Sequence, residues 1–206
     1  DLNLLIGNSS VAHMGFIFLG IASLNIIGLT GAVLVMIAHG LLAALAFGLS
    51  GHFYQQNSSL DMTQMGGLLR KMPLAGTAFL MAMMAGCGLP GFANFAGELT
   101  IFFAAWSAGY KLITVIAVWS ALVVGGLYML RAIRNILHGP QGDTWKNSKD
   151  SSPLVTTAFG LLLALLLVFG FAPNLLTKGI EIEVKKIVYL VKPEIDEANH
   201  LDVVTR

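Results

Sequence analysis

The first sixty residues carry a single charged side chain, Asp1, and the next one appears only at Asp61. A stretch of this length without charges cannot form the surface of a water-soluble domain. Across the whole chain, charged residues make up 11%, hydrophobic residues make up 56%, and the mean hydropathy is +0.77. Because soluble globular proteins have about 25% charged residues, this composition excludes an ordinary soluble domain and predicts an integral membrane protein.

Six apolar stretches predict an all-α membrane fold with about six transmembrane helices, because about 20 apolar residues cross a bilayer core of about 30 Å. The stretches cover residues 9–24, 28–53, 73–88, 92–108, 112–137 and 153–172. The motif Gly88-Leu89-Pro90-Gly91 predicts a break in the helix that precedes it. Lysines and arginines are divided almost evenly between the two ends of these stretches, so they do not fix the orientation in the membrane.

The stretches predict three regions along the chain. Residues 1–138 hold about five helices, residues 139–172 a polar loop and the last transmembrane helix, and residues 173–206 an amphipathic or surface segment. In the last region, Ile180, Val184 and Ile187 follow a helical spacing, which favours a helix lying along the membrane surface or a partner. The alternation Ile-Glu-Ile-Glu-Val at 180–184 fits a strand as well. Since the chain starts at Asp1 without a signal-peptide pattern, we expect an incomplete or processed chain.

Composition and motifs exclude several classes of site. The net charge of +1 gives no case for nucleic acid, which needs a clustered basic surface. Cys87 is the only cysteine, which excludes an intramolecular disulfide and a multi-cysteine metal site. The glycines of the apolar stretches have no strand–turn–helix context, so they predict helix contacts and not a phosphate-binding loop. No haem, iron–sulfur or zinc motif is present in the sequence, and we expect no redox cofactor in this chain.

Three ionisable residues lie inside the apolar stretches. Glu98 is the only acidic residue in any of them, and His13 and His39 lie in the first two. An ionisable group in a transmembrane helix costs about 2.5–3.5 kcal/mol on insertion scales. These residues therefore predict a functional site, with each group paired to a partner inside the bundle.

The chemistry of these groups suits proton transfer. Glu98 follows the helix break, where a carboxyl group can take up and release protons if protein or water satisfies the freed backbone. The imidazole of His39 can accept one proton while it donates another, so we expect it to relay protons towards Glu98. His13 follows Ser9 and Ser10 by one helical turn, and its ring can instead simply bond a hydroxyl group. The other interpretation of all three is that they only cross-link helices, as a protonated glutamic acid and neutral core histidines.

Three motifs, in this order, resemble one known family. Residues 9–16 (SSVAHMGF), residues 31–41 (GAVLVMIAHGL) and the run from Gly66-Gly67-Leu68 through GLPG at 88–91 to Gly97-Glu98 match its signatures. The family comprises the antiporter-like, proton-pumping membrane subunits of respiratory complex I, NADH:quinone oxidoreductase. Glutamate after the GLPG break is typical of the M/ND4 type, whereas most relatives carry lysine there. Glu98 therefore favours the complex I type.

The resemblance implies a fold of about fourteen transmembrane helices with two inverted repeats, each containing a broken helix. This chain would correspond to the second repeat and the last helix, helices nine to fourteen, with Glu98 in the broken twelfth. By the same resemblance, His13 and His39 lie on a central polar axis and Glu98 is the terminal proton site. NADH, FMN, iron–sulfur clusters and quinone would belong to the parent complex. The partners would be neighbouring antiporter-like subunits, the missing N-terminal half and the lipid bilayer.

The function implied by this resemblance is proton translocation, coupled to electron transfer from NADH to quinone elsewhere in the complex. The chain would act as a translocase subunit, in the mitochondrial inner membrane or a bacterial plasma membrane. One alternative is a subunit of a cation/proton antiporter or a membrane-bound hydrogenase, which shares the helices but not the NADH chemistry. Another alternative is a structural membrane scaffold.

Overall fold

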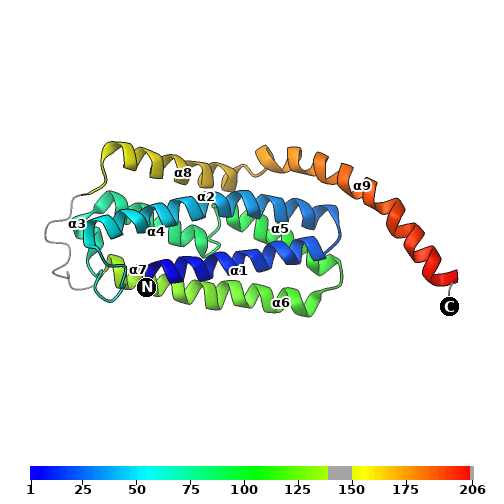
Figure 1. The fold of residues 1–206 in the computed structure, drawn as a ribbon, viewed down its shortest axis with the longest axis horizontal. Coiled ribbons are helices and arrows are strands. Elements are labelled where there is room, and N and C mark those ends of the chain that lie inside the picture. Colours follow the sequence, from blue (N-terminus) through cyan, green and yellow to red (C-terminus); the bar gives the residue numbers. More distant parts are fainter. Residues whose placement is uncertain (139–149, 205–206) are drawn as a thin grey trace.

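The computed structural model describes residues 1–138 and 150–204, and all regular secondary structure in these residues is helical (Figure 1). The elements are α1 (Leu2–Ala22), α2 (Ile26–Asn57), α3 (Leu68–Lys71), α4 (Pro73–Gly86), α5 (Ala93–Ser107), α6 (Lys111–Trp119), the π-helix η1 (Ser120–Gly125), α7 (Gly126–Leu137), α8 (Pro153–Phe171) and α9 (Asn174–Val204). The all-α prediction is confirmed. The strand interpretation of residues 180–184 is wrong, because they lie within α9.

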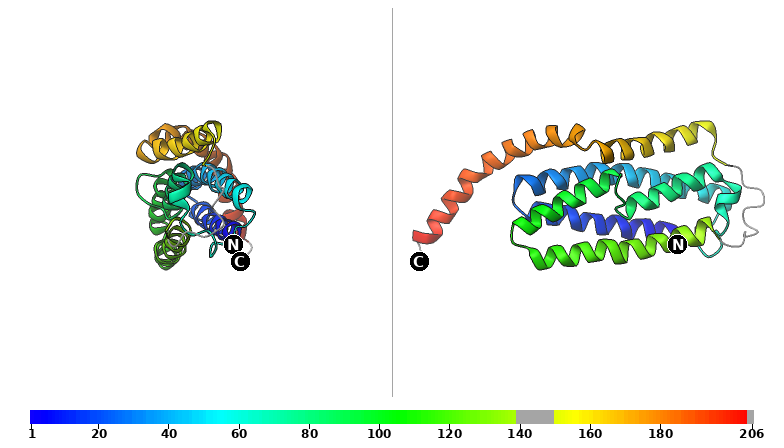
Figure 2. Two further views of the ribbon diagram at one scale, coloured as in Figure 1. Left: turned by 90° about the vertical axis from the view of Figure 1, so that its left-hand side faces the viewer. Right: turned by 180° about the vertical axis from the view of Figure 1, so that it is seen from behind.

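The helices form an elongated bundle in which α2 is central (Figure 1, Figure 2). Helices α1, α4, α5, α8 and α9 all pack against α2. The first two helices begin where the sequence supplies capping side chains. The Asp1 carboxylate accepts from the Leu4 amide at 3.2 Å, and the Asn25 side-chain oxygen accepts from the Gly28 amide at 2.8 Å.

Four helical segments are long and apolar enough to cross a membrane: α1, α2, the continuous run Lys111–Leu137 and α8. The predicted third and fourth spans appear instead as α4 and α5, with 14 and 15 residues. At a rise of about 1.5 Å per residue, each is shorter than a bilayer core of about 30 Å. They follow one another along the bundle axis on either side of the break (Figure 2). The prediction of two separate crossings here is therefore not supported, because the chain continues past the break without reversing.

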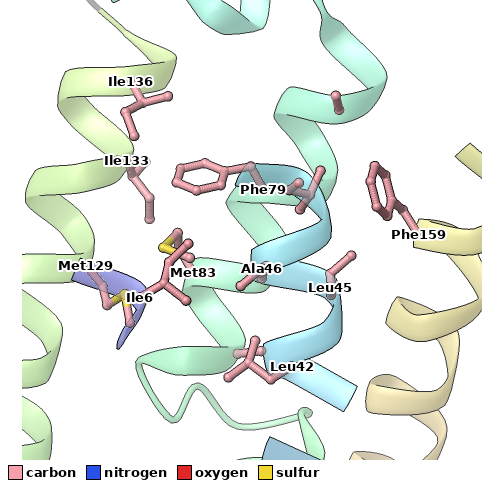
Figure 3. Packing of buried hydrophobic residues seen from close by; sticks show 14 of the residues in the cluster. Ile6, Leu42, Leu45, Ala46, Phe79, Met83, Met129, Ile133, Ile136 and Phe159 are labelled. Carbon is pink, nitrogen blue, oxygen red and sulfur yellow. The ribbon is translucent and has the colours of Figure 1, made fainter. Parts of the chain in front are cut away.

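A dense apolar core fills one end of the bundle, between α2, α4 and α7 (Figure 3). Phe53 and Phe79 are completely buried there, and their rings meet edge to face at a centroid distance of 5.7 Å. Leu45 and Met83 pack beside them. Since lipid tails are as apolar as leucine, such close packing, and not transfer out of water, holds helices together inside a bilayer.

Small residues bring α2 and α5 into close contact beside this core. A Cβ atom added at Gly97 would lie 2.5 Å from Cγ2 of Val35, and one at Gly31 would lie 3.2 Å from the Gly97 carbonyl oxygen. Glycine at both positions therefore allows the two helix backbones to approach each other. This contact sets how closely the residues of α5 approach those of α2.

The outer surface of the bundle is apolar along its length. Val11, Leu112 and Leu154 are each at least 70% exposed, and they lie on three different helices. Such side chains suit contact with lipid. The chain is an integral membrane protein, as its composition predicts.

The remaining elements frame the bundle. Helix α8 packs against α2, α4 and α5, and α9 begins beside α2 and extends beyond the end of the bundle (Figure 1). The polar linker predicted over residues 139–152 lies mostly outside the described residues. Its described end includes Asp150, whose carboxylate accepts from the amides of Leu74 at 2.9 Å and Ala75 at 3.2 Å. This carboxylate caps the first turn of α4, where Pro73 has no amide hydrogen to donate.

Candidate functional site

The three ionisable residues singled out from the sequence come together between three helices. His13 comes from α1, His39 from α2 and Glu98 from α5, and each side chain is buried. The Nε2 atom of His13 lies 3.4 Å from Oε1 of Glu98. The rings of His13 and His39 are stacked, with centroids 4.8 Å apart and planes inclined by 25°. The order is therefore His39, His13, Glu98, with His13 and not His39 beside the carboxyl group.

The backbone fixes the proton arrangement on His13. Its Nδ1 lies 2.8 Å from the carbonyl oxygen of Ser9, and a carbonyl oxygen can only accept a hydrogen bond. Nδ1 therefore carries the hydrogen in the neutral ring, and Nε2 presents its lone pair towards Glu98. At 3.4 Å the His13–Glu98 contact is slightly longer than an ordinary hydrogen bond of about 2.7–3.2 Å, so a small movement closes it.

His39 has a hydroxyl partner on α1. Its Nε2 lies 2.6 Å from Oγ of Ser10, a distance typical of a strong hydrogen bond. Its Nδ1 atom is buried and has no hydrogen-bond partner among the described residues. Ser10 can exchange its hydroxyl proton with the ring, because a serine hydroxyl both donates and accepts. We did not expect a role for Ser10 beside His39, because the two residues are 29 positions apart in the sequence.

The helix break lies directly against Glu98. Gly88 has φ +69°, and a Cβ atom added there would lie 2.8 Å from Oε2 of Glu98. Gly91 has φ +104°, a conformation that also favours glycine. One turn before Glu98, the side chain of Asn94 is completely buried, and neither its oxygen nor its nitrogen has a partner among the described residues. A buried polar group without a partner is costly, which is typical of a site with a purpose other than stability.

A cavity of about 60 Å³ opens beside His13 and Glu98. Besides these two, its lining includes Cys87 at the break, Ser120 on η1 and Tyr128 on α7. Since about 10–15 Å³ of such space holds one water molecule, the cavity has room for a few. The π-helix contributes Ser120, Ala121 and Gly125 to the wall, and wide turns of this kind are frequent at functional sites. The sequence offered no signal for this turn beyond the Gly125-Gly126 pair.

A smaller cavity of about 20 Å³ adjoins His39, and its mostly apolar lining includes Ser9, Ser10 and Met129. Ser10 and His39 thus line the smaller cavity, and His13 and Glu98 line the larger one. Within residues 1–138 and 150–204, no three His, Cys, Asp or Glu side chains converge as metal ligands. The arrangement is chemically suited to passing protons between hydroxyl, imidazole and carboxyl groups.

Comparison with known proteins shows which family the sequence matches. A family model described as "NADH:quinone oxidoreductase/Mrp antiporter, TM" matches residues 1–124. NAD(P)H-quinone oxidoreductase chain 4 1 of Synechococcus elongatus is 37% identical over 181 residues, which cover 84% of this chain and 33% of the relative. The protein of the same name from a Picosynechococcus species is 32% identical over 195 residues, or 91% of this chain and 36% of the relative. This chain thus spans about a third of the length of these curated relatives.

Solved structures share the fold. A chain of respiratory complex I from Thermus thermophilus with bound NADH superimposes with a TM-score of 0.80 and 24% identity, over 90% of this chain and 39% of that chain. A chain of the Mrp complex from a Dietzia species gives a TM-score of 0.75 and 20% identity, over 84% of this chain and 40% of that chain. At these identities the likeness establishes the common arrangement of helices.

Proposed function

The chain belongs to the NADH:quinone oxidoreductase/Mrp antiporter transmembrane family, and from that premise we propose that it forms part of a proton-translocating NADH:quinone oxidoreductase, of the chain 4 type. Proton movement through its buried polar groups is coupled to electron transfer from NADH to quinone elsewhere in the complex. NADH, FMN, iron–sulfur clusters and quinone belong to other parts of that assembly. The names of the curated relatives support this assignment over the antiporter branch of the family.

One observation carries the proposal: a histidine on α1 stands between a second histidine and the only buried carboxyl group among the described residues. Glu98 binds a proton from the cavity and transfers it to Nε2 of His13. The resulting imidazolium is stabilised by the carbonyl oxygen of Ser9 at Nδ1. His39 and Ser10 are the next groups on the path. Because the stacked rings share no hydrogen bond among the described residues, a water molecule or a turn of the His13 ring carries the proton from Nε2 of His13 to His39. Because the two rings are stacked, charge on one disfavours charge on the other, and protons pass singly.

We also propose how the chain crosses the membrane. Helices α4 and α5 together make one broken crossing, so that α1, α2, α4–α5, α6–α7 and α8 give five. Residues 1–138 form the proton-conducting part and residues 139–172 include the final crossing. Residues 173–206 extend towards neighbouring membrane subunits. The rest of the proton path lies in the part of the relatives that this chain does not match, or in adjacent antiporter-like subunits.

The test is NADH-driven proton pumping in native membrane vesicles carrying Glu98→Gln, with assembly checked on a native gel. The glutamine keeps the shape and hydrogen bonding of the side chain but cannot release a proton. We expect pumping to fall by at least about tenfold in the assembled complex, because positioned proton donors and acceptors typically contribute about 10²–10⁴-fold. The matched control is Glu183→Gln on α9, where the carboxylate is exposed and pairs with Lys186, and pumping should be unchanged.

Two results would contradict the proposal. Full pumping by assembled Glu98→Gln would remove Glu98 from the proton path and favour a scaffold role. Sodium-linked proton exchange without any NADH-linked pumping, in vesicles of the unmodified protein, would favour the antiporter branch of the family.

A further inference from the structure

The break between α4 and α5 is enclosed on two sides. On one side, Gly88 lies against the carboxyl group of Glu98. On the other side, the last turn of α8 reaches Gly91, about 80 residues earlier in the chain. Helix α8 thus packs against the Gly91 end of the break, and Glu98 packs against its Gly88 end.

The contact between α8 and the break requires glycine. A Cβ atom added at Gly170 would collide with the carbonyl oxygen of Gly91 and would lie 2.5 Å from its carbonyl carbon and 2.6 Å from that of Phe92. These are backbone atoms, which cannot rotate away as a side chain can. Next to it, the Phe171 side chain is 79% exposed, but the edge of its ring touches Gly91, since a Cβ atom there would be 3.3 Å from Cζ. The two backbones are therefore in direct contact at the break.

Helix α8 contributes no group that could itself carry a proton in this path. The segment Pro153–Phe171 contains no Asp, Glu, His, Lys, Arg, Cys or Tyr. The titratable groups around Glu98 come from other elements. His13 of α1, Cys87 at the end of α4 and Tyr128 of α7 share its cavity, and His39 stands behind His13. Any effect of α8 on Glu98 is therefore one of packing, through the backbone of the break or through the α5 helix that carries Glu98.

We propose that Gly170 and Phe171 are positioning residues for Glu98. By fitting against Gly91 and Phe92, α8 fixes the path of the break, and the break in turn holds Gly88 against Oε2 of Glu98. The last crossing is then part of the proton site and not only a membrane anchor. The proposal rests on the proposed function for its effect on pumping, but the positioning itself can be measured without pumping.

The experiment compares Gly170→Ala with Gly160→Ala in the complete complex in native membranes. Both are glycine-to-alanine changes in α8, but a Cβ atom at Gly160 meets nothing within 4 Å. Two quantities are measured after assembly is checked on a native gel. The first is the pH dependence of NADH-driven pumping. The second is the infrared C=O stretching band of the protonated Glu98 carboxyl group, assigned by its loss in Glu98→Gln.

We expect Gly170→Ala to move the Glu98 band and to shift the midpoint of the pH profile by at least about half a pH unit, a change of about threefold in proton affinity. Gly160→Ala should leave both as in the unmodified protein. If Gly170→Ala does not assemble, Phe171→Leu decides, because it removes the ring over Gly91 without adding an atom next to the backbone. It should also move the band, by a smaller amount.

An unchanged band and pH profile in assembled Gly170→Ala, or in Phe171→Leu where the first variant does not assemble, would overturn the proposal. The outcomes also separate the two levels of inference. If Gly170→Ala shifts the band but Glu98→Gln pumps normally, α8 positions Glu98 but Glu98 is not part of the proton path. If Gly170→Ala leaves the band unshifted but Glu98→Gln loses pumping, Glu98 is part of the path and α8 does not position it.

Discussion

The two halves of α2 pack against very different surroundings. Its second half, including Leu45, Leu49 and Phe53, contacts α4 and α8 through close-packed apolar side chains (Figure 3). The region around His39 faces α1, where cavities adjoin the polar groups, and buried polar atoms of His39 and Asn94 have no partner among the described residues. The region around Phe53 is thus a closely packed apolar core, while the region around His39 leaves buried polar atoms without hydrogen-bond partners among the described residues. Such a difference is typical of functional sites, and it agrees with the proton path proposed for these residues.

The sharpest test of the packed half is Phe79→Ala. The Phe79 ring is fully buried against Phe53, and its loss should lower the free energy of unfolding by about 3–5 kcal/mol, as for other buried phenylalanines. We expect a lower thermal denaturation temperature of the solubilised complex and less assembled protein. The control is Phe18→Ala on α1, where the ring is 69% exposed; it should change neither.

The same variant tests whether the two halves are independent. Pumping per assembled complex should stay within about twofold of the unmodified protein with Phe79→Ala, because a cavity in the core leaves the groups around His13 in place. A specific loss of pumping, greater than the loss of assembly, would contradict the division of the bundle into a packed half and a conducting half.

The polar half is tested by His13→Gln. Glutamine retains hydrogen bonding but cannot become a cation, so transfer from Glu98 to α1 is interrupted. We expect pumping to fall by about tenfold, less than the full contribution of a positioned proton acceptor, because water in the cavity can replace the ring in part. Thermal stability should change little, since the contact to Glu98 is long.

The control for this variant is His52→Gln. His52 lies on the same helix as His39 but near the outer end of α2, where its ring contacts Phe53 and Phe159. Equal losses of pumping in the two variants would mean that the loss does not depend on the contact with Glu98. That result would remove the distinction between the two halves.

Much of this division could be predicted from the sequence. The uncharged run before Asp61 predicted the first two helices, and Glu98, His13 and His39 were singled out as the ionisable residues of the apolar stretches. What the sequence could not give was the rotation of each helix about its axis. Rotation decides that His13, and not His39, faces Glu98, and that Ser10 faces His39. These helices are apolar on all sides, so their sequences have little hydrophobic periodicity to show which side of a helix faces which neighbour.

The sequence predicts where the helix before the Gly-Leu-Pro-Gly motif ends, but not the direction of the helix that follows. A Gly-Leu-Pro-Gly motif shows that a helix ends, whereas the direction of the following helix depends on the backbone angles of Gly88 and Gly91 and on what packs against them. The contact of Gly170 with Gly91 is of this kind, because it joins segments about 80 residues apart. The π-helix is another example, since Ser120–Gly125 has the same apolar composition as its neighbours.

The smallest effect is expected outside both halves, at Asp61 in the loop between α2 and α3. Hydrogen bonds from the backbone amide and hydroxyl group of Thr63, at 3.0 and 2.8 Å, lower the pKa of this exposed carboxyl group. Because the pKa of Asp61 is lower in the folded state than in the unfolded state, the ionised carboxylate stabilises the fold at pH values above the unfolded pKa of about 3.9. This stabilisation is lost as the pH falls below that value. Asp61→Asn should therefore lower the denaturation temperature slightly at neutral pH, with the difference narrowing below about pH 4. Pumping should be unchanged, because the Asp61 carboxylate accepts hydrogen bonds from Thr63 and Gln64 of its own loop, while other elements line the cavity beside Glu98. A pumping defect in Asp61→Asn would mean that charges at the membrane surface feed the path, and that the conducting region extends beyond the half of the bundle assigned to it.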